Sequence, residues 1–110
     1  MQSVLEDIRV LDFGRFVAAP YCGMLLADMG AEVIKIESVD NYDLIRTFVF
    51  LPSSTENPWN KSAYFNHYNR GKLGVTMNLA KERGKDLFRE LVKISDVVIQ
   101  NMRPGVIDRL

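Results

Sequence analysis

The strongest constraint on the fold is a strand, a helix and a second strand that follow one another within residues 8–37. Residues Ile8 to Phe13, which end in the mainly apolar run Val10–Phe13, predict a buried strand. Pro20 suits the first turn of a helix, where its missing N–H costs nothing, and Gly30 is a typical helix stop. Glu32 to Glu37 (EVIKIE) are rich in β-branched residues and predict the second strand. Such a unit is nearly always right-handed with parallel strands.

The first predicted helix has an apolar face, on which Cys22, Leu25, Leu26 and Met29 recur with helical spacing. We therefore expect this face to pack into the core, and Cys22 to be a buried structural residue. Because Cys22 is the only cysteine, the chain can form neither an intrachain disulfide nor a cysteine metal cluster.

The second half of the chain repeats the alternation of strand and helix after a long polar connection, residues 38–69. A connection of this length inside a compact domain is usually functional or mobile. The expected parallel strands lie near Ile8–Phe13, Val33–Glu37, Gly74–Asn78 and Val97–Gln100, and the helices near Pro20–Met29 and Glu82–Ile94. We predict an α/β fold: a Rossmann-like parallel sheet with flanking helices, which binds ligands at the carboxyl edge of its strands.

The sequence also predicts which residues of the last strand and of the helix before it are buried. The strand at Asp96–Gln100 (DVVIQ) is expected to be buried. The helix before it is expected to turn one apolar face inward, formed by Leu87, Phe88, Leu91, Val92 and Ile94.

Composition excludes several classes of protein. With 14 basic and 14 acidic residues among 110, the formal net charge is zero, which argues against broad nucleic-acid binding. The sequence shows no signal peptide and no apolar stretch that could span a membrane, so we expect a soluble, cytoplasmic protein with no membrane partner.

The last residues, Val106–Leu110, look like the start of a helix without an end. We expect residues 1–110 to be the N-terminal piece of a longer chain.

The sequence contains no visible acid–base pair, nucleophile constellation or metal-ligand spacing. His67 stands alone, which is more typical of a surface or packed histidine than of a catalyst. We assign no catalytic residue and no metal site to these residues.

The turn from Gly14 to Pro20 lies where a dinucleotide-binding fold carries G-x-G-x-x-G, and only Gly14 of that pattern is present. Two interpretations remain open. The turn is either a tight connection between strand and helix, or an anion site formed by helix N-terminal amides and Arg15.

Two later turns carry basic residues. In NRGKLG (Asn69–Gly74), Arg70 or Lys72 can contact a phosphate, but the sequence somewhat favours a basic turn that leads into a strand. In NMRPG (Asn101–Gly105), the guanidinium of Arg103 suits bidentate recognition of phosphate or carboxylate, with a structural cap as the alternative.

In their order along the chain, these segments resemble the class III CoA-transferases, the group that contains formyl-CoA, carnitine and benzylsuccinate CoA-transferases and α-methylacyl-CoA racemase. The resemblance covers nearly the whole chain after Glu6. It is carried by VLDFGRFVAAPYCGMLLADMGAEVIKIE, a polar loop with Asp43 and Arg46, the pair Asn69 and Lys72, a strand ending in Asn78, and VVIQNMRPGVIDRL.

The resemblance implies a coenzyme A (CoA) site at the turns after the strands. Its residues are Phe16, Val17, Ala18, Ser38, Met77, Asn78, Leu79, Ala80, Asn101, Met102, Arg103 and Arg109. CoA presents an adenine, a 3′-phosphate and a pyrophosphate, which require arginine donors beside apolar walls. Family members often have Arg at the position of Ser38, and some have Gln at that of Val17. CoA or acyl-CoA is then a substrate, and no tightly bound cofactor is expected.

The resemblance also implies the chemistry. The transferases use an aspartate nucleophile that forms a mixed anhydride with the acyl group and then an enzyme-bound CoA thioester, before a carboxylate acceptor is activated. The racemases instead exchange an α-proton with a His/Asp pair. Both sets of catalytic residues lie downstream of NMRPG, so we expect residues 1–110 alone to show neither activity.

Three functions therefore remain as hypotheses. The first is the N-terminal CoA-binding α/β portion, residues 1–110, of a CoA-transferase that acts on acyl-CoA and carboxylate molecules. The second is an acyl-CoA racemase of the α-methylacyl-CoA type. The third is a non-catalytic nucleotide-binding or interaction module. For the enzymes, the resemblance implies a homodimer of two interlocked chains.

Overall fold

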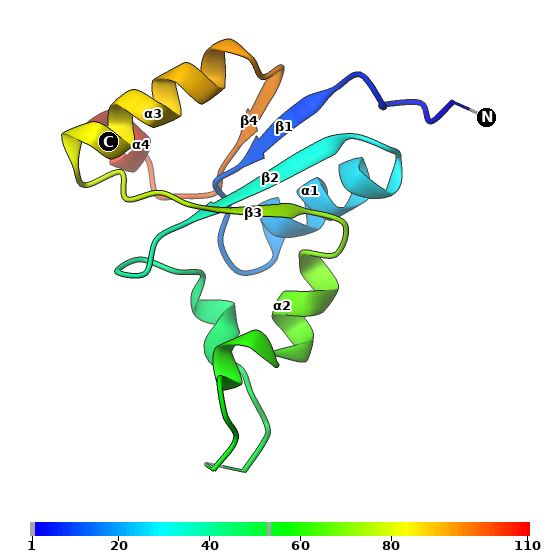
Figure 1. The fold of residues 1–110 in the computed structure, drawn as a ribbon, viewed down its shortest axis with the longest axis vertical. Coiled ribbons are helices and arrows are strands. Elements are labelled where there is room, and N and C mark those ends of the chain that lie inside the picture. The colour runs from blue at the N-terminus through cyan, green and yellow to red at the C-terminus, as the bar shows by residue number, and fades with distance from the viewer. Residues whose placement is uncertain (1, 53) are drawn as a thin grey trace.

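The computed structural model describes residues 2–52 and 54–110, and its centre is a four-stranded sheet in the order β3-β2-β1-β4 (Figure 1). All three strand pairings are parallel. The strands are β1 (Arg9–Asp12), β2 (Glu32–Glu37), β3 (Leu73–Thr76) and β4 (Val97–Ile99). The predicted α/β fold with a parallel sheet and flanking helices is confirmed, although β1, β3 and β4 are shorter than expected.

Helices cover both faces of the sheet. The longer ones are α1 (Ala18–Asp28) and α3 (Glu82–Lys93), and the chain closes with α4 (Val106–Arg109). Since alternate side chains of a strand point to opposite faces, Leu11 and its neighbours pack on α3 and α4, whereas Val10 packs on α1. Figure 1 shows α3 and α4 together, away from α1.

The order of the strands reverses beside β1. The chain runs from β1 to β2 to β3, and then returns to place β4 on the other side of β1. The turns after β1 and β4 therefore leave the same edge of the sheet at a topological switch point. Open α/β sheets bind their ligands at such a point.

In its described residues, the polar connection contains three short helices, separated by irregular segments. It contains η1 (Leu44–Thr47), η2 (Pro58–Asn60) and α2 (Ala63–Tyr68). The buried Ser62 links two of these helices, since its Oγ accepts the Phe65 N–H at 3.2 Å as the cap of α2 and donates to the Ile45 carbonyl at 2.9 Å. None of the helices in the described ranges is both long and apolar enough to cross a bilayer.

The predicted inner face of α1 is correct only at Leu26, which packs against the core. Cys22, Leu25 and Met29 are exposed, and Ala19, Gly23 and Met24 are buried instead. Since α1 is apolar around most of its circumference, hydrophobic spacing alone did not single out the buried face. The buried face is the one with small residues, because a Cβ on Gly23 would lie only 3.1 Å from Asp12 Oδ2. The predicted helix stop is correct, because Gly30 follows α1 with a φ of +99°.

The expected burial of β4 is also wrong, because β4 is an edge strand whose Val97 and Val98 are 40% and 41% exposed. The inner face of α3 is narrower than predicted. Phe88 and Leu91 pack on the core cluster, whereas the other three apolar residues of that face are exposed: Leu87, Val92 and Ile94.

Candidate functional site

The turns after β1 and β4 are joined by one side chain, Asn101. Its Oδ1 accepts the Arg15 N–H at 2.8 Å, and its Nδ2 donates to the Arg15 carbonyl at 2.8 Å. Both backbone groups of Arg15 are thereby satisfied by a residue 86 positions later in the chain. Asn101 therefore fixes the separation of the two turns at the switch point.

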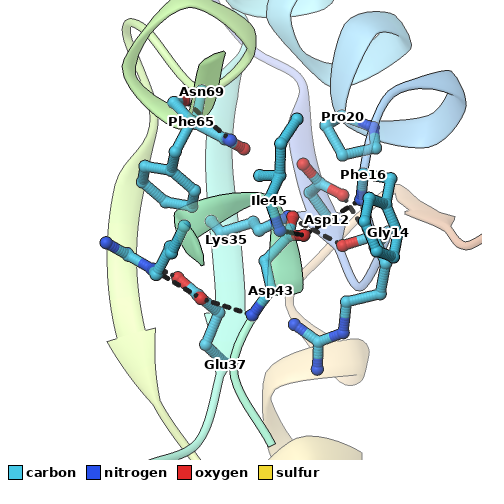
Figure 2. Close-up of polar contacts among 12 residues, drawn as sticks. Asp12, Gly14, Phe16, Pro20, Lys35, Glu37, Asp43, Ile45, Phe65 and Asn69 are labelled. Carbon is cyan, nitrogen blue, oxygen red and sulfur yellow. Dashed lines mark hydrogen bonds and ion pairs between the residues drawn. The ribbon is translucent and has the colours of Figure 1, made fainter. Parts of the chain in front are cut away.

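A buried ion pair holds the other side of the same turn (Figure 2). Lys35 Nζ lies 2.8 Å from Asp43 Oδ2, with side-chain exposures of 3% and 0%. Lys35 also donates to the Gly14 carbonyl at 2.7 Å, and Asp43 Oδ1 accepts the Phe16 N–H at 3.0 Å. Lys35 comes from the middle of β2 and Asp43 from the segment before η1, so two elements converge on the turn.

Phe16 has an unusual backbone, with a φ of +60°. A left-handed conformation costs a bulky residue about 1 kcal/mol or more and persists only where the surroundings enforce it. The ring of Phe16 is 41% exposed and meets Phe48 edge-on, with ring centroids 6.4 Å apart. Helix α1 begins two residues later, so the conformation of Phe16 sets the direction in which the helix leaves the turn.

A second buried ion pair lies beside the first. Lys72 Nζ donates to Asp12 Oδ2 at 2.6 Å, to the Pro20 carbonyl at 2.8 Å and to Asn69 Oδ1 at 2.9 Å. Burial lowers the pKa of Lys72 below its ordinary value, although the hydrogen bond and charge of Asp12 act in the opposite direction. Asp12 also accepts the Gly14 N–H at 2.8 Å through Oδ1. The ion pair therefore joins β1, the start of α1 and the turn before β3.

The basic turn before β3 is structural, as the sequence somewhat favoured. All three hydrogens of the Lys72 ammonium group have acceptors within the protein. Arg70 forms an ion pair with Asp28 at the end of α1, with Nη2 2.7 Å from Oδ2. Both cations are thus paired with carboxylates of the protein.

Glu37, at the end of β2, is held by Arg46. The guanidinium donates to both carboxylate oxygens, at 2.9 Å and 2.8 Å, and lies over the ring of Phe65. Burial alone would raise the pKa of Glu37, but hydrogen bonds from Arg46 and the Asp43 N–H, with the charges of Arg46 and Lys35, hold it below the ordinary value.

This lowered pKa predicts an acid-sensitive contribution to stability. Because the folded-state pKa of Glu37 lies below the ordinary value of 4.5, the contribution is present above that pH and is lost as the pH falls through the folded-state pKa. In urea unfolding, the unfolding free energy of Glu37→Gln should decrease less at acidic pH than that of the unmodified protein. The control Glu32→Gln removes an exposed carboxylate paired with Arg9, and its unfolding free energy should decrease as steeply as that of the unmodified protein. Equal slopes for the two variants would contradict this account.

A cleft of about 360 Å³ opens beside the turn between β1 and α1. Its lining consists of Phe13, Arg15, Ser38, Asp40, Asn41, Met77, Asn78, Leu79, Ala80, Lys81 and Leu110. The ends of β2 and β3 are tied there, since Asn78 Nδ2 donates to Asp40 Oδ2 at 3.0 Å. The cleft thus combines apolar walls with two cationic side chains, Arg15 and Lys81.

Arg15 is the more constrained of these two cations. Its Nη2 donates to the Asn41 carbonyl at 3.0 Å, and its guanidinium lies 5.5 Å from the centre of the Phe13 ring. Its Nη1 is buried without a hydrogen-bond partner among the described residues. Burial lowers the pKa of Arg15, against the opposing charges of nearby carboxylates, of which Asp43 acts most strongly.

A larger hollow of about 700 Å³ lies on the side of η1 and η2. It shares Ser38 with the first cleft, and the rest of its lining is Glu37, Val39, Tyr42, Arg46, Thr47, Val49, Pro58, Trp59, Asn60 and Thr76. Its two charged side chains, Glu37 and Arg46, already bind each other. Apart from Ser38, none of the CoA-site residues expected from the sequence lines it.

The expected CoA-site residues fall into three groups. Ser38 and residues 77–80 line the smaller cleft. Phe16–Ala18 lie between β1 and the first residue of α1, and Asn101 binds the same turn from the segment after β4. Met102 packs on the core cluster, whereas Arg103 and Arg109 are exposed beyond β4.

Sequence reasoning missed the buried charges that organise the turn. Asp12 and Lys35 interrupt otherwise apolar strands and are paired neighbours in the β1–β2 register. Such interruptions were the available signal, since a charge inside a buried strand requires a partner. Asp12 is paired with Lys72, 60 positions later, and Lys35 with Asp43, which lies beyond the end of β2. Neither spacing nor periodicity could assign these partners.

Comparisons with known proteins agree with this geometry. The sequence profile of CoA-transferase family III matches residues 5–110. A succinyl-CoA:mesaconate CoA-transferase from Haloarcula marismortui is 41% identical over 108 residues, which cover 97% of this chain and 26% of that protein. An acyl-CoA transferase from Fusarium pseudograminearum is 38% identical over 114 residues, covering 99% of this chain and 25% of that protein.

A solved structure is similar over the same range. A CAIB/BAIF family protein from Brucella suis superimposes with a TM-score of 0.85 at 36% identity, covering 99% of this chain and 28% of that one. The chain therefore spans about a quarter of the length of the curated relatives it matches.

Proposed function

Because the chain belongs to CoA-transferase family III, we propose that the full-length protein moves CoA from an acyl-CoA donor to a carboxylate acceptor, and that residues 1–110 form the N-terminal part of its CoA site. The similar proteins named above are CoA- or acyl-CoA transferases. Their names favour transfer over the racemase alternative and over a non-catalytic module.

The observation that carries the proposal is the smaller cleft beyond the carboxyl ends of β1, β2 and β3. Its apolar side chains, such as Met77 and Leu79, offer walls for a flat base, and Arg15 and Lys81 offer positive charge for phosphate oxygens. The exposed Arg103, on the turn after β4, supplies a further donor near the same edge of the sheet. Adenine and phosphates are the groups that CoA presents, so this chemistry supports CoA as the ligand.

We expect the full-length protein to bind CoA and the variant Arg103→Ala to bind it about 10- to 100-fold more weakly, because a charge-assisted hydrogen bond contributes roughly 1.5–3 kcal/mol. Isothermal titration calorimetry measures both affinities. The matched control is Arg89→Ala on α3, where the exposed guanidinium pairs with Asp86, and its affinity should equal that of the unmodified protein. An unchanged affinity in Arg103→Ala would remove this residue from the site.

The reaction itself separates the hypotheses. Full-length protein incubated with acyl-CoA donors and carboxylate acceptors should form a new acyl-CoA, whereas a racemase would exchange the α-proton without an acceptor.

A homodimer is part of the proposal, and sedimentation of the full-length protein tests it. Full-length protein that binds no CoA would overturn the proposed function.

A further inference from the structure

The turn between β1 and α1 is saturated with side-chain hydrogen bonds. Asp12 accepts from the Gly14 N–H, Lys35 donates to the Gly14 carbonyl, and Asn101 engages both backbone groups of Arg15. Asp43 accepts from the Phe16 N–H. Five consecutive backbone groups thus bind side chains, and within the described part of the chain none of them binds another backbone group.

Among these side chains, Asp43 acts at the strained residue. Its Oδ1 receives the amide of Phe16, the residue with a φ of +60°. Its Oδ2 is held by Lys35, and its own N–H donates to Glu37 Oε2 at 2.9 Å. The carboxylate is fully buried. With both oxygens and its backbone fixed, Asp43 has no freedom to follow Phe16 into an ordinary conformation.

We infer that Asp43 is a positioning residue for CoA binding: by accepting the Phe16 N–H it holds Phe16 in the left-handed conformation, and so fixes the turn whose Arg15 lines the smaller cleft. This inference rests on the proposed function. Asp43 also accepts the Ile45 N–H at 3.2 Å as the cap of η1, so a test must separate positioning of the turn from support of that short helix.

The first test uses two variants of the full-length protein that both lack the ion pair, Lys35→Met/Asp43→Asn and Lys35→Met/Asp43→Leu. Asparagine keeps an oxygen for the Phe16 amide, whereas leucine has a similar size and none. We expect CoA to bind about tenfold more weakly to the leucine variant than to the asparagine variant, measured by calorimetry on folded protein. Equal dissociation constants would overturn the inference.

The second test places the same two variants in Phe16→Gly and Phe16→Ala backgrounds. Both backgrounds lack the ring, but only glycine adopts a positive φ without strain. We expect the difference between asparagine and leucine at position 43 to persist with alanine and to shrink to less than about twofold with glycine. A role confined to capping η1 predicts the same difference in both backgrounds, and that result would overturn the inference.

A third comparison applies if the leucine variants do not fold. In Asp43→Asn alone, the buried Lys35 ammonium attracts the amide oxygen and turns the amide N–H₂ toward Phe16. Adding Lys35→Met should then restore CoA affinity about tenfold, and no restoration would overturn the inference. Failure of the unmodified protein to bind CoA would overturn the proposed function and this inference together, whereas the outcomes above concern Asp43 alone.

Discussion

Replacing Lys72 by methionine is expected to lower the free energy of unfolding by about 3–5 kcal/mol, because it leaves a buried carboxylate without its partner. Lys72 and Asp12 are 2% and 0% exposed, so water cannot take the place of the ammonium group. The Pro20 carbonyl and Asn69 Oδ1 would lose a donor at the same time. Urea unfolding followed by circular dichroism measures the loss.

Two further variants test this explanation. Lys72→Met/Asp12→Asn removes the stranded charge and keeps an oxygen for the Gly14 N–H, so most of the lost stability should return. Arg70→Met, two residues earlier in the same turn, breaks only the exposed pair with Asp28 and should change the unfolding free energy little. A similar loss in Lys72→Met and Arg70→Met would show that the buried pair has no special importance.

The second large effect is expected for Gly84→Ala, in the first turn of α3. A Cβ at this position would lie 1.9 Å from the Asn78 carbonyl oxygen and 2.7 Å from its carbon. Both contacts are with backbone, so α3 must move away from the segment after β3. We expect a loss of about 3 kcal/mol in unfolding free energy, typical of severe overpacking.

The same substitution should weaken CoA binding, because Asn78 lines the smaller cleft. The control is Gly74→Ala in β3, where a Cβ would meet no atom within 4 Å, so that stability should be unchanged or slightly raised. Comparable losses in the two variants would indicate that the effect of Gly84→Ala comes from glycine itself and not from the close contact.

The sheet was predictable because its central strands combine β-branched residues with clear stops. Val10 and Leu11 in β1, and Ile34 and Ile36 in β2, are nearly inaccessible, so their apolar runs reflect burial on both faces. The family was predictable for a related reason: its motifs occupy the turns at the ends of these strands, in an order that few other folds would reproduce.

Which side of each helix faces the sheet was not predictable in the same way. The apolar circumference of α1 offers several equivalent faces, and close packing of Gly23 against Asp12 and Ile99 selects one of them. At β4, the valines suggested burial, but the strand lies at the edge of the sheet. Periodicity records which residues are apolar, and tertiary contacts decide which of them are covered.

The candidate site was predictable only in part. The family resemblance selected Ser38 and residues 77–80, and these residues do line one cleft. The left-handed Phe16 had no local signal, and the charge of Lys35 inside an apolar strand indicated that it needs a partner without indicating which one. The conformation of the turn depends on Asp43, 27 positions after Phe16, and on Asn101, 86 positions after Arg15, which spacing within one segment cannot express.

The bond between Asn101 and Arg15 has a consequence for the order of folding. The two residues are 86 positions apart, and closing so long a loop is slow compared with forming α1 or pairing β1 with β2. The turn after β1 is synthesised early, yet it can take its final form only after β4 has emerged and docked. A nascent chain that stops short of residue 101 would carry the sequence of the turn without the partner that shapes it.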